Sequence, residues 1–386
     1  MNPGTVAIMP PGALGVSFFY HLTGGLERLD RSVFFIGLDE SRSIDSLLAG
    51  DLRIASGGTL HALPAPEFIY RSLNDVFEAG ALPEVLIVCP NPDQLLPVIS
   101  TLVALIERLC MGNDDACQQL PTIILSSNGI YFQRVRQMFI EKLEESTLLG
   151  RLPDLWPDQM PYIIGHFLRG VTIQTGLREG SGSNAIYRPG PRGISLLVGG
   201  GEAVRRRSFE LLSGLGGWFE LASNVSPTRL EFEKAIVNLT VNFLGLLYAF
   251  DFEEGFRPLT IAEILTPEHE PAVRELAYRV FEIGRAVKAF TQVDDFEKVL
   301  ADALARCRPI SSHIPSSLQT IDLQIKLDRL EVKFTPTETW LVDPLIRYAR
   351  SSNLPEAADY FEGLRAMLMA KLEKAVARQA LNRPKA

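Results

Sequence analysis

The sequence has few cysteines and no excess of positive charge. Its 386 residues include 4 cysteines, Cys89, Cys110, Cys117 and Cys307, and none forms a CxxC pair or stands at zinc-ligand spacing from a histidine. We therefore expect neither a disulfide framework nor a metal site. Lysine and arginine number 38 against 46 aspartates and glutamates, for a net charge of −8. This balance argues against a nucleic-acid partner.

Long apolar runs are also missing. The longest, around residues 235–250, is too short and too polar to span a membrane, and the first residues lack the pattern of a signal peptide. We therefore predict a cytoplasmic protein without a membrane partner. The remaining composition is 46% hydrophobic and 22% charged, which is typical of a globular protein, and the length suits two or three domains.

Short, continuous apolar runs alternate with helical patterns in the first half of the chain. These runs predict buried strands at residues 5–9, 32–38, 85–89 and 123–125. Continuous rather than alternating apolar strands are typical of a parallel sheet covered on both faces. Three further runs look like short strands that extend this sheet as an antiparallel or mixed edge, at residues 170–175, 185–188 and 194–198.

From about Pro227 onward the strand signals disappear. Helical spacing continues through residues 230–249, 270–290, 295–307 and 355–379. The prediction is therefore an α/β part followed by an all-α part. We expect a Rossmann-like doubly wound sheet over residues 1–225 and an all-helical domain over residues 226–386.

The turn after the first expected strand carries part of a dinucleotide-binding fingerprint. The three glycine positions of G-x-G-x-x-G correspond to Pro10, Gly12 and Gly15 in this chain, so two of the three glycines are present. Gly12 lets the backbone approach a pyrophosphate, Gly15 lets the helix pack on the strand, and the helix start at Ala13 and Leu14 offers N–H groups to phosphates. Because proline has no N–H and a fixed φ, the turn is either built differently or is a plain strand–helix connection.

Two further loops are candidates for cofactor contacts. Asp39 follows the second expected strand and suits the ribose hydroxyls of NAD, whereas Arg42 suits the 2′-phosphate of NADP. The alternative is that both belong to a solvated loop. Asn128 ends the fourth strand, at the edge where ligands of open α/β sheets bind, or it forms a simple Asn-Gly turn.

A polar stripe marks an otherwise apolar helix in the second half. Lys234, Asn238 and Asn242 are spaced four residues apart, which places them on one face of an α-helix. Because the other residues are strongly apolar, we expect the helix to be buried and the stripe to meet partners or a ligand. Burial lowers the pKa of a lysine, which favours proton donation. The alternative is a helix with one wet face.

Glu338 lies in the segment Thr335–Thr339, just before an apolar helical pattern. An acidic residue is favourable in the first turn of a helix, so Glu338 is either a helix-start residue or an active-site carboxylate.

Taken in order along the chain, these motifs resemble the ketopantoate reductase (2-dehydropantoate 2-reductase) family, within the 6-phosphogluconate dehydrogenase-like superfamily. VAIMPPGALG is similar to the family's nucleotide loop and SSNG to its Asn-Gly motif. KAIVNLTVN is similar to its K-x-x-x-N-x-x-x-N helix, the most specific match. SSLQ at residues 316–319 and TE at residues 337–338 resemble its late serine and T-E-I-D motifs.

The resemblance implies an NAD(P)H-dependent reductase of a 2-oxo acid on the route to pantothenate. Residues 1–225 would then bind the dinucleotide, and residues 226–386 would bind the substrate. The helical part also has enough apolar surface to support a homodimer. Lys234 would be the general acid and Glu338 would bind the substrate's hydroxyl. The residues implied to position the substrate are Asn128, Asn238, Asn242, Ser316 and Ser317.

The chain departs from the family at several positions. Pro10 replaces the first glycine, Asp39 stands where the family has an arginine, and the T-E-I-D-x-x-N-G run becomes TETWLVDP. These departures keep two other functions open. One is a Rossmann-fold binding or regulatory protein without hydride transfer, and the other is a dehydrogenase acting on another substrate.

Overall fold

The chain divides into two compact units, which we describe separately as unit 1 (Met1–Pro227) and unit 2 (Thr228–Ala386). The structure is a computed structural model that describes residues 5–38, 42–112, 120–146, 159–180, 182–216, 218–250 and 255–382. The division falls between residues 227 and 228, against the expected 225 and 226.

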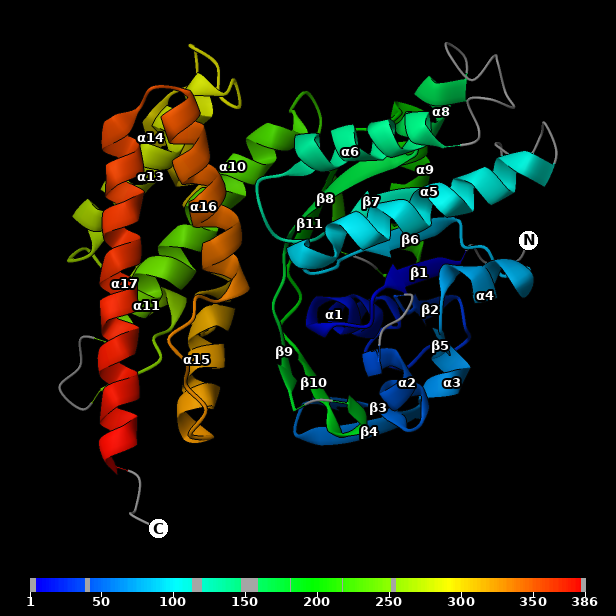
Figure 1. The fold of residues 1–386 in the computed structure, drawn as a ribbon, viewed down its shortest axis with the longest axis horizontal. Coiled ribbons are helices and arrows are strands. Elements are labelled where there is room, and N and C mark those ends of the chain that lie inside the picture. Colours follow the sequence, from blue (N-terminus) through cyan, green and yellow to red (C-terminus); the bar gives the residue numbers. More distant parts are fainter. Residues whose placement is uncertain are drawn as a thin grey trace. The chain divides into compact units, whose positions relative to one another are not determined.

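Unit 1 is built on an eight-stranded sheet in which β1 lies between β2 and β6 (Figure 1). All neighbours run parallel except β8 and β11, which pair antiparallel. In order across the sheet, the strands are β12 (Phe219–Leu221), β11 (Ile194–Val198), β8 (Phe167–Ile173), β7 (Thr122–Leu125), β6 (Val85–Val88), β1 (Val6–Met9), β2 (Val33–Ile36) and β5 (Ile69–Tyr70).

Helices cover both faces of this sheet, as the continuous apolar strands predict. Along β1, Val6 and Ile8 join one core cluster while Ala7 and Met9 join the other, because successive side chains point to opposite faces. The cluster with Ala7 includes residues of α4 (Leu73–Glu78), α5 (Leu95–Gly112), α6 (Phe132–Glu145) and α8 (Met160–Gly165). The cluster with Val6 includes residues of α1 (Ala13–Leu22), α2 (Arg42–Leu48), α3 (Ala65–Phe68) and α9 (Glu202–Gly214).

A second sheet packs against α1, and it corrects one expectation. Its four strands are, in order, β4 (Thr59–Pro64), β3 (Asp51–Ser56), β10 (Ile186–Pro189) and β9 (Gly176–Glu179). The run at residues 185–188 therefore belongs to this sheet and does not extend the large one. The close fit depends on Gly176, where an added Cβ would lie 2.4 Å from Oγ of Ser17 on α1.

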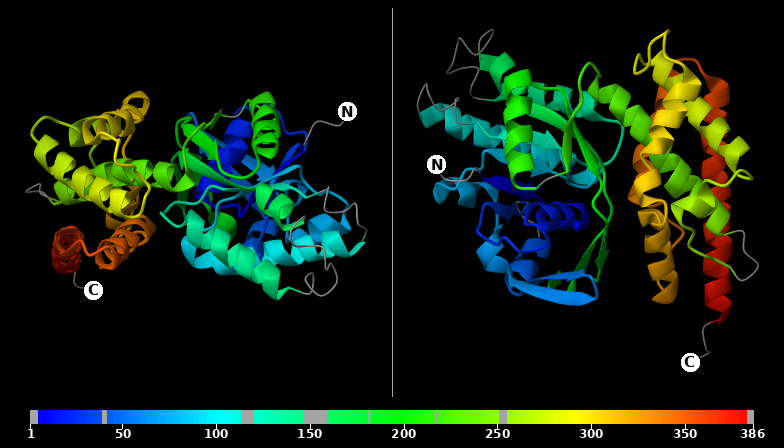
Figure 2. Two further views of the ribbon diagram at one scale, coloured as in Figure 1. Left: turned by 90° about the horizontal axis from the view of Figure 1, so that it is seen from above. Right: turned by 180° about the vertical axis from the view of Figure 1, so that it is seen from behind.

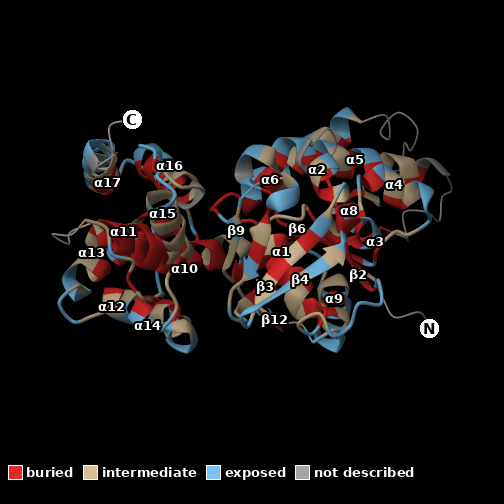
Figure 3. Cartoon of the chain, turned by 90° about the horizontal axis from the view of Figure 1, so that it is seen from below, coloured by how far each residue is buried: buried red, intermediate tan, exposed pale blue. Residues whose placement is uncertain are grey.

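Every regular element of unit 2 within the described residues is helical, as expected (Figures 1 and 2). A central buried helix consists of α10 (Pro227–Asn238), a π-helical segment (Leu239–Leu244) and α11 (Gly245–Ala249) (Figure 3). The surrounding helices are α12 (Ile261–Ile264), α13 (Glu270–Ala286), α14 (Phe296–Ala305), α15 (Ser316–Lys326), α16 (Pro336–Ser351) and α17 (Pro355–Asn382).

One expectation about cysteine is wrong. Cys110, near the end of α5, is disulfide-bonded, whereas Cys89 and Cys307 are free thiols. The partner of Cys110 lies outside the described residues. The expectation rested on the missing CxxC spacing, which does not exclude a bridge at the end of a helix. Among the described helices, none is long and apolar enough to cross a membrane.

Candidate functional site

The centre of the large sheet is a topological switch point. From β1 the chain continues to β2 and β5 on one side, whereas β6, β7 and β8 lie on the other side. Open α/β sheets bind ligands at such a point, outside the carboxyl ends of the strands. The loops that follow β1, β6 and β7 therefore form the candidate site in unit 1.

The turn after β1 places five expected cofactor residues together, from Pro10 to the first turn of α1. The Met9–Pro10 peptide bond is cis, and the carbonyl of Pro10 accepts a hydrogen bond from the N–H of Gly12 at 2.8 Å. The hydroxyl of Tyr187, on β10, donates to the carbonyl of Pro11 at 3.1 Å. Burial raises the pKa of Tyr187, which keeps this hydroxyl protonated. The turn is thus closed without a glycine at position 10.

The two glycines of this turn have different surroundings. A Cβ added at Gly15 would lie 2.5 Å from the carbonyl oxygen of Pro10 and 3.1 Å from Cγ2 of Ile8. A Cβ added at Gly12, the N-cap of α1, would have no atom within 4 Å. Gly15 therefore permits close packing of the helix on the strand, and Gly12 leaves open space over the backbone at the start of α1. Ala13 and Leu14 follow in the first turn, where helical N–H groups lack partners within the helix.

Main-chain hydrogen bonds join the last residues of β1 and β6 to the residues that follow the neighbouring strands. The N–H of Cys89 donates to Met9 O at 2.7 Å, and the N–H of Ser126 donates to Val88 O at 2.7 Å. Burial raises the pKa of the Cys89 thiol to about 12, so this thiol stays protonated and is not a nucleophile. Cys89 therefore contributes packing at the switch point.

Asn128 lies exposed in the loop after β7, and that loop is braced by a residue that sequence reasoning missed. Arg169 on β8 is fully buried and donates to Leu125 O at 2.6 Å and to Ser127 O at 2.8 Å. A single charged residue inside the apolar run FLRGVTI is the signal that could have found it. Arg169 also donates to Gly129 O at 3.5 Å, so it braces the backbone before and after Asn128.

The expected ribose-binding loop is only partly described. Asp39 lies outside the described residues. Arg42 is the first residue of α2, and its side chain lies outside them as well. The expectations for NAD through Asp39 and for NADP through Arg42 therefore stay predictions.

In unit 2 the polar residues of the predicted stripe lie on the central helix, which is α-helical at Lys234 and π-helical at Asn242. Lys234 is buried in α10, Asn238 ends α10 half-buried, and Asn242 is buried in the π-helical segment. A π-helical turn bonds i to i+5, which rotates the residues that follow it relative to an α-helix. Residues four positions apart lie close to one full turn apart in either type of helix, so a shared stripe of Lys234, Asn238 and Asn242 stays a prediction.

Asn242 caps a neighbouring helix, and this contact brings together two of the predicted substrate residues. Its Oδ1 accepts from the N–H of Ser317 at 3.1 Å, in the first turn of α15. The hydroxyls of Ser317 and Thr335 lie 3.2 Å apart. Ser316 starts α15 beside them, and Glu338 lies in the first turn of α16, with a side chain outside the described residues.

An ion network holds the start of α10. Glu233 accepts from Arg229 at 3.0 Å and from Arg306 at 2.6 Å, and Arg229 also bonds Asp294 at 2.6 Å. Burial alone would raise the pKa of Asp294, but hydrogen bonds from Thr291 and Arg229 lower it below its usual value. The network anchors the helix next to Lys234. In the described ranges, no group of three or more His, Cys, Asp or Glu residues is placed to hold a metal ion.

The class that this fold defines is a Rossmann-like α/β unit followed by a helical unit, and solved structures share it. D-mandelate dehydrogenase in complex with NADH and anilino(oxo)acetate is 18% identical, with a TM-score of 0.63 over 96% of this chain and 99% of that chain. A ketopantoate reductase from Ralstonia eutropha is 14% identical, with a TM-score of 0.54 over 95% of this chain and 99% of that chain. A dimeric ketopantoate reductase from Staphylococcus aureus is 16% identical, with a TM-score of 0.53 over the same shares.

At these identities the likeness establishes the fold. No protein-family profile and no curated protein sequence matches the chain. The structural resemblance to ketopantoate reductases, which the sequence motifs predict, is confirmed at the level of the fold along nearly the whole chain.

Proposed function

We propose that this protein is an NAD(P)H-dependent reductase of a 2-oxo acid, similar to 2-dehydropantoate 2-reductase. The observation that carries the proposal is the turn after β1, at the switch point, with open space over Gly12 and a close contact under Gly15. The fold shared with an NADH-bound dehydrogenase supports the same function.

In this proposal, unit 1 binds the cofactor. Gly12 leaves room for a pyrophosphate, and the N–H groups of Ala13 and Leu14 donate to its oxygens, as helix starts do in Rossmann folds. The loop from Asp39 to Arg42 contacts the ribose, and Asn128 contacts the cofactor or the substrate. Because Asp39 suits free ribose hydroxyls, we expect no strong preference for NADPH over NADH.

Lys234 acts as the general acid. A bound nicotinamide supplies the hydride, and Lys234 donates a proton to the carbonyl oxygen as negative charge develops there. Its place on a buried, apolar helix, anchored through Glu233, limits the positions of the ammonium group. Asn238, Ser316 and Glu338 hold the substrate.

Asn242 and Ser317 act mainly by ordering the start of α15, since Oδ1 of Asn242 is already bonded to the Ser317 N–H. A homodimer and a cytoplasmic location stay predictions.

The test is oxidation of NADH and NADPH with a panel of 2-oxo acids, including 2-dehydropantoate and an aromatic 2-oxo acid. Lys234→Ala should lower kcat at least about 100-fold, because a positioned general acid contributes that much. The matched control is Lys298→Ala, an exposed lysine on α14. Turnover with none of the acids, or full activity of Lys234→Ala, would overturn the proposal.

A second candidate is a protein that binds the dinucleotide without hydride transfer, and Pro10 in place of the first glycine favours it. Calorimetry with NADH separates the outcomes. Gly12→Ala should weaken NADH binding at least about tenfold with no loss of thermal stability, because a Cβ there meets only open space. Tight NADH binding without turnover would favour the second candidate, and absence of binding would exclude both.

A further inference from the structure

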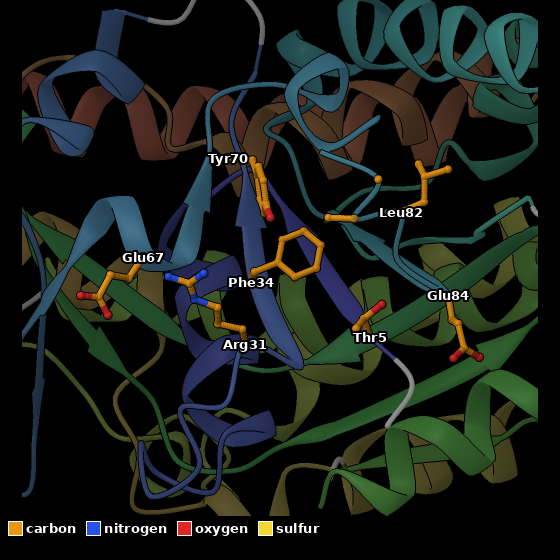
Figure 4. A pocket seen from close by; sticks show the side chains of 9 residues that line it. Thr5, Arg31, Phe34, Glu67, Tyr70, Leu82 and Glu84 are labelled. Atoms are coloured by element: carbon orange, nitrogen blue, oxygen red, sulfur yellow. The ribbon is translucent and has the colours of Figure 1, made fainter. Parts of the chain in front are cut away.

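A pocket of about 330 Å³ lies in unit 1 at the amino ends of β1, β2 and β6 (Figure 4). This is the opposite end of the strands from the turn that contains Gly12. Phe34 and Tyr70 line the pocket, and their rings meet edge to face with centroids 5.3 Å apart. Leu82 lies on another side of the Phe34 ring. The volume is at the lower end of the range for small-molecule sites.

The short length of β5 opens this pocket. The ladder between β2 and β5 pairs only Phe35 with Ile69 and Ile36 with Tyr70. Within the described sheet, β5 therefore leaves the outer edge of Phe34 without a strand partner. The hollow is therefore bordered by the aromatic rings of Phe34 and Tyr70, which offer a ligand an apolar surface.

Charged side chains surround this apolar surface. Arg31 lines the pocket with φ of +62°, a conformation that is uncommon for residues other than glycine, asparagine and aspartate. Such backbone outliers often accompany functional sites. Among the described residues, Arg31, Glu67 and Glu84 form no ion pair with one another or with any other side chain. In the view of Figure 4, Arg31 and Glu67 lie on one side of Phe34 and Glu84 lies on the other.

We propose that this pocket binds a small zwitterion, an α-amino acid with an aromatic or large apolar side chain. The carboxylate meets the Arg31 guanidinium, the ammonium group meets Glu67, and the side chain packs on the half-buried Tyr70 and Leu82 next to Phe34. An amino acid carries both charges on one carbon atom, which suits a pocket lined by both an arginine and a glutamate. Two glutamates against one arginine disfavour a plain anion.

Three ligands of similar shape test separately what the carboxylate and the ammonium group contribute to binding. Calorimetry is performed on the full chain with L-phenylalanine, with phenylacetate, which lacks the ammonium group, and with phenethylamine, which lacks the carboxylate. L-phenylalanine should bind at millimolar concentration or below, and each analogue at least about tenfold more weakly, because each loses a charge-assisted contact. Absence of L-phenylalanine binding, or equal binding of phenylacetate, would overturn the proposal.

Substitutions then assign the binding to this pocket. Arg31→Gln should weaken L-phenylalanine binding at least about tenfold, while Arg134→Gln, which removes an exposed arginine on α6, should not. If Arg31→Gln lowers the melting temperature, Arg31→Asn provides the second variant, since asparagine tolerates the positive φ. Unchanged binding in both Arg31 variants places the ligand elsewhere and rejects this site. NADH binding, measured in the same variants, should stay unchanged.

Discussion

The carboxyl ends of the central strands in unit 1 and the central helix of unit 2 are stabilised in different ways. We refer to the first of these regions as the sheet edge. At the sheet edge, the contacts are made to main-chain carbonyl groups. The Pro10 oxygen would lie 2.5 Å from a Cβ at Gly15, and the Leu125 and Ser127 oxygens accept hydrogen bonds from Arg169. In the helix, side chains set it, through the Asn242 cap and the ion pairs of Glu233. Substitutions of the two glycines should therefore act through the shape of the backbone, whereas substitutions of Arg169 and of the polar residues in the helix should act through lost polar partners.

This difference decides which pattern in the sequence is predictive. A strand, a tight turn and a helix bring residues together within one short segment, so the spacing of Gly12 and Gly15 predicts their surroundings. The spacing of Lys234, Asn238 and Asn242 predicts one face of a helix, but it does not predict which residues of other helices meet that face. Asn242 lies in the π-helical segment that starts at Leu239, and its partner is Ser317 on α15, far along the chain.

The largest effect is expected at Arg169. Arg169→Met should lower the free energy of unfolding by about 3 kcal/mol, because it leaves buried carbonyls of Leu125 and Ser127 without donors. Urea denaturation measures the change. Arg53→Met, on β3, removes an arginine that makes no hydrogen bond among the described residues and should cost less than about 0.5 kcal/mol. Equal midpoints for both variants would show that Arg169 does not brace the loop.

The next effect separates the two glycines of the turn. Gly15→Ala should lower the free energy of unfolding by about 1 to 2 kcal/mol, the cost of a clash with a main-chain oxygen less the gain in helix propensity. Gly12→Ala, with open space around the new Cβ, should change it by less than about 0.5 kcal/mol. If Gly15→Ala is as stable as the unchanged protein, the helix is not held against the strand by this contact.

Hydrophobic pattern predicted most of the large sheet, because each buried strand is a continuous apolar run between turn residues. It missed β3 and β4, whose residues are partly exposed and alternate with polar ones. It also missed β12, which has only three residues. The burial of α10 was predicted correctly from its apolar residues.

Contacts between residues far apart in the chain were not predictable from one sequence. Arg169 bonds carbonyls more than 40 residues earlier, and Asn242 bonds a residue 75 positions later. No local spacing encodes such pairs, because they depend on how whole strands and helices pack. For the same reason the motif predicted Asn242 as a substrate-binding residue but did not predict its hydrogen bond to the start of α15.

The smallest effect tests that role in unit 2. Asn242→Ala should lower the free energy of unfolding by about 1 kcal/mol, the usual cost of losing a helix cap. Hydrogen exchange should speed up at the first amides of α15 and leave α13 unchanged. Asn238→Ala is the matched control, since Asn238 is half-buried and makes no side-chain hydrogen bond among the described residues. It should be nearly as stable as the unchanged protein. Because Asn238 is proposed to hold the substrate, Asn238→Ala should raise KM. Measurements of stability and KM together therefore assign the two asparagines to different roles.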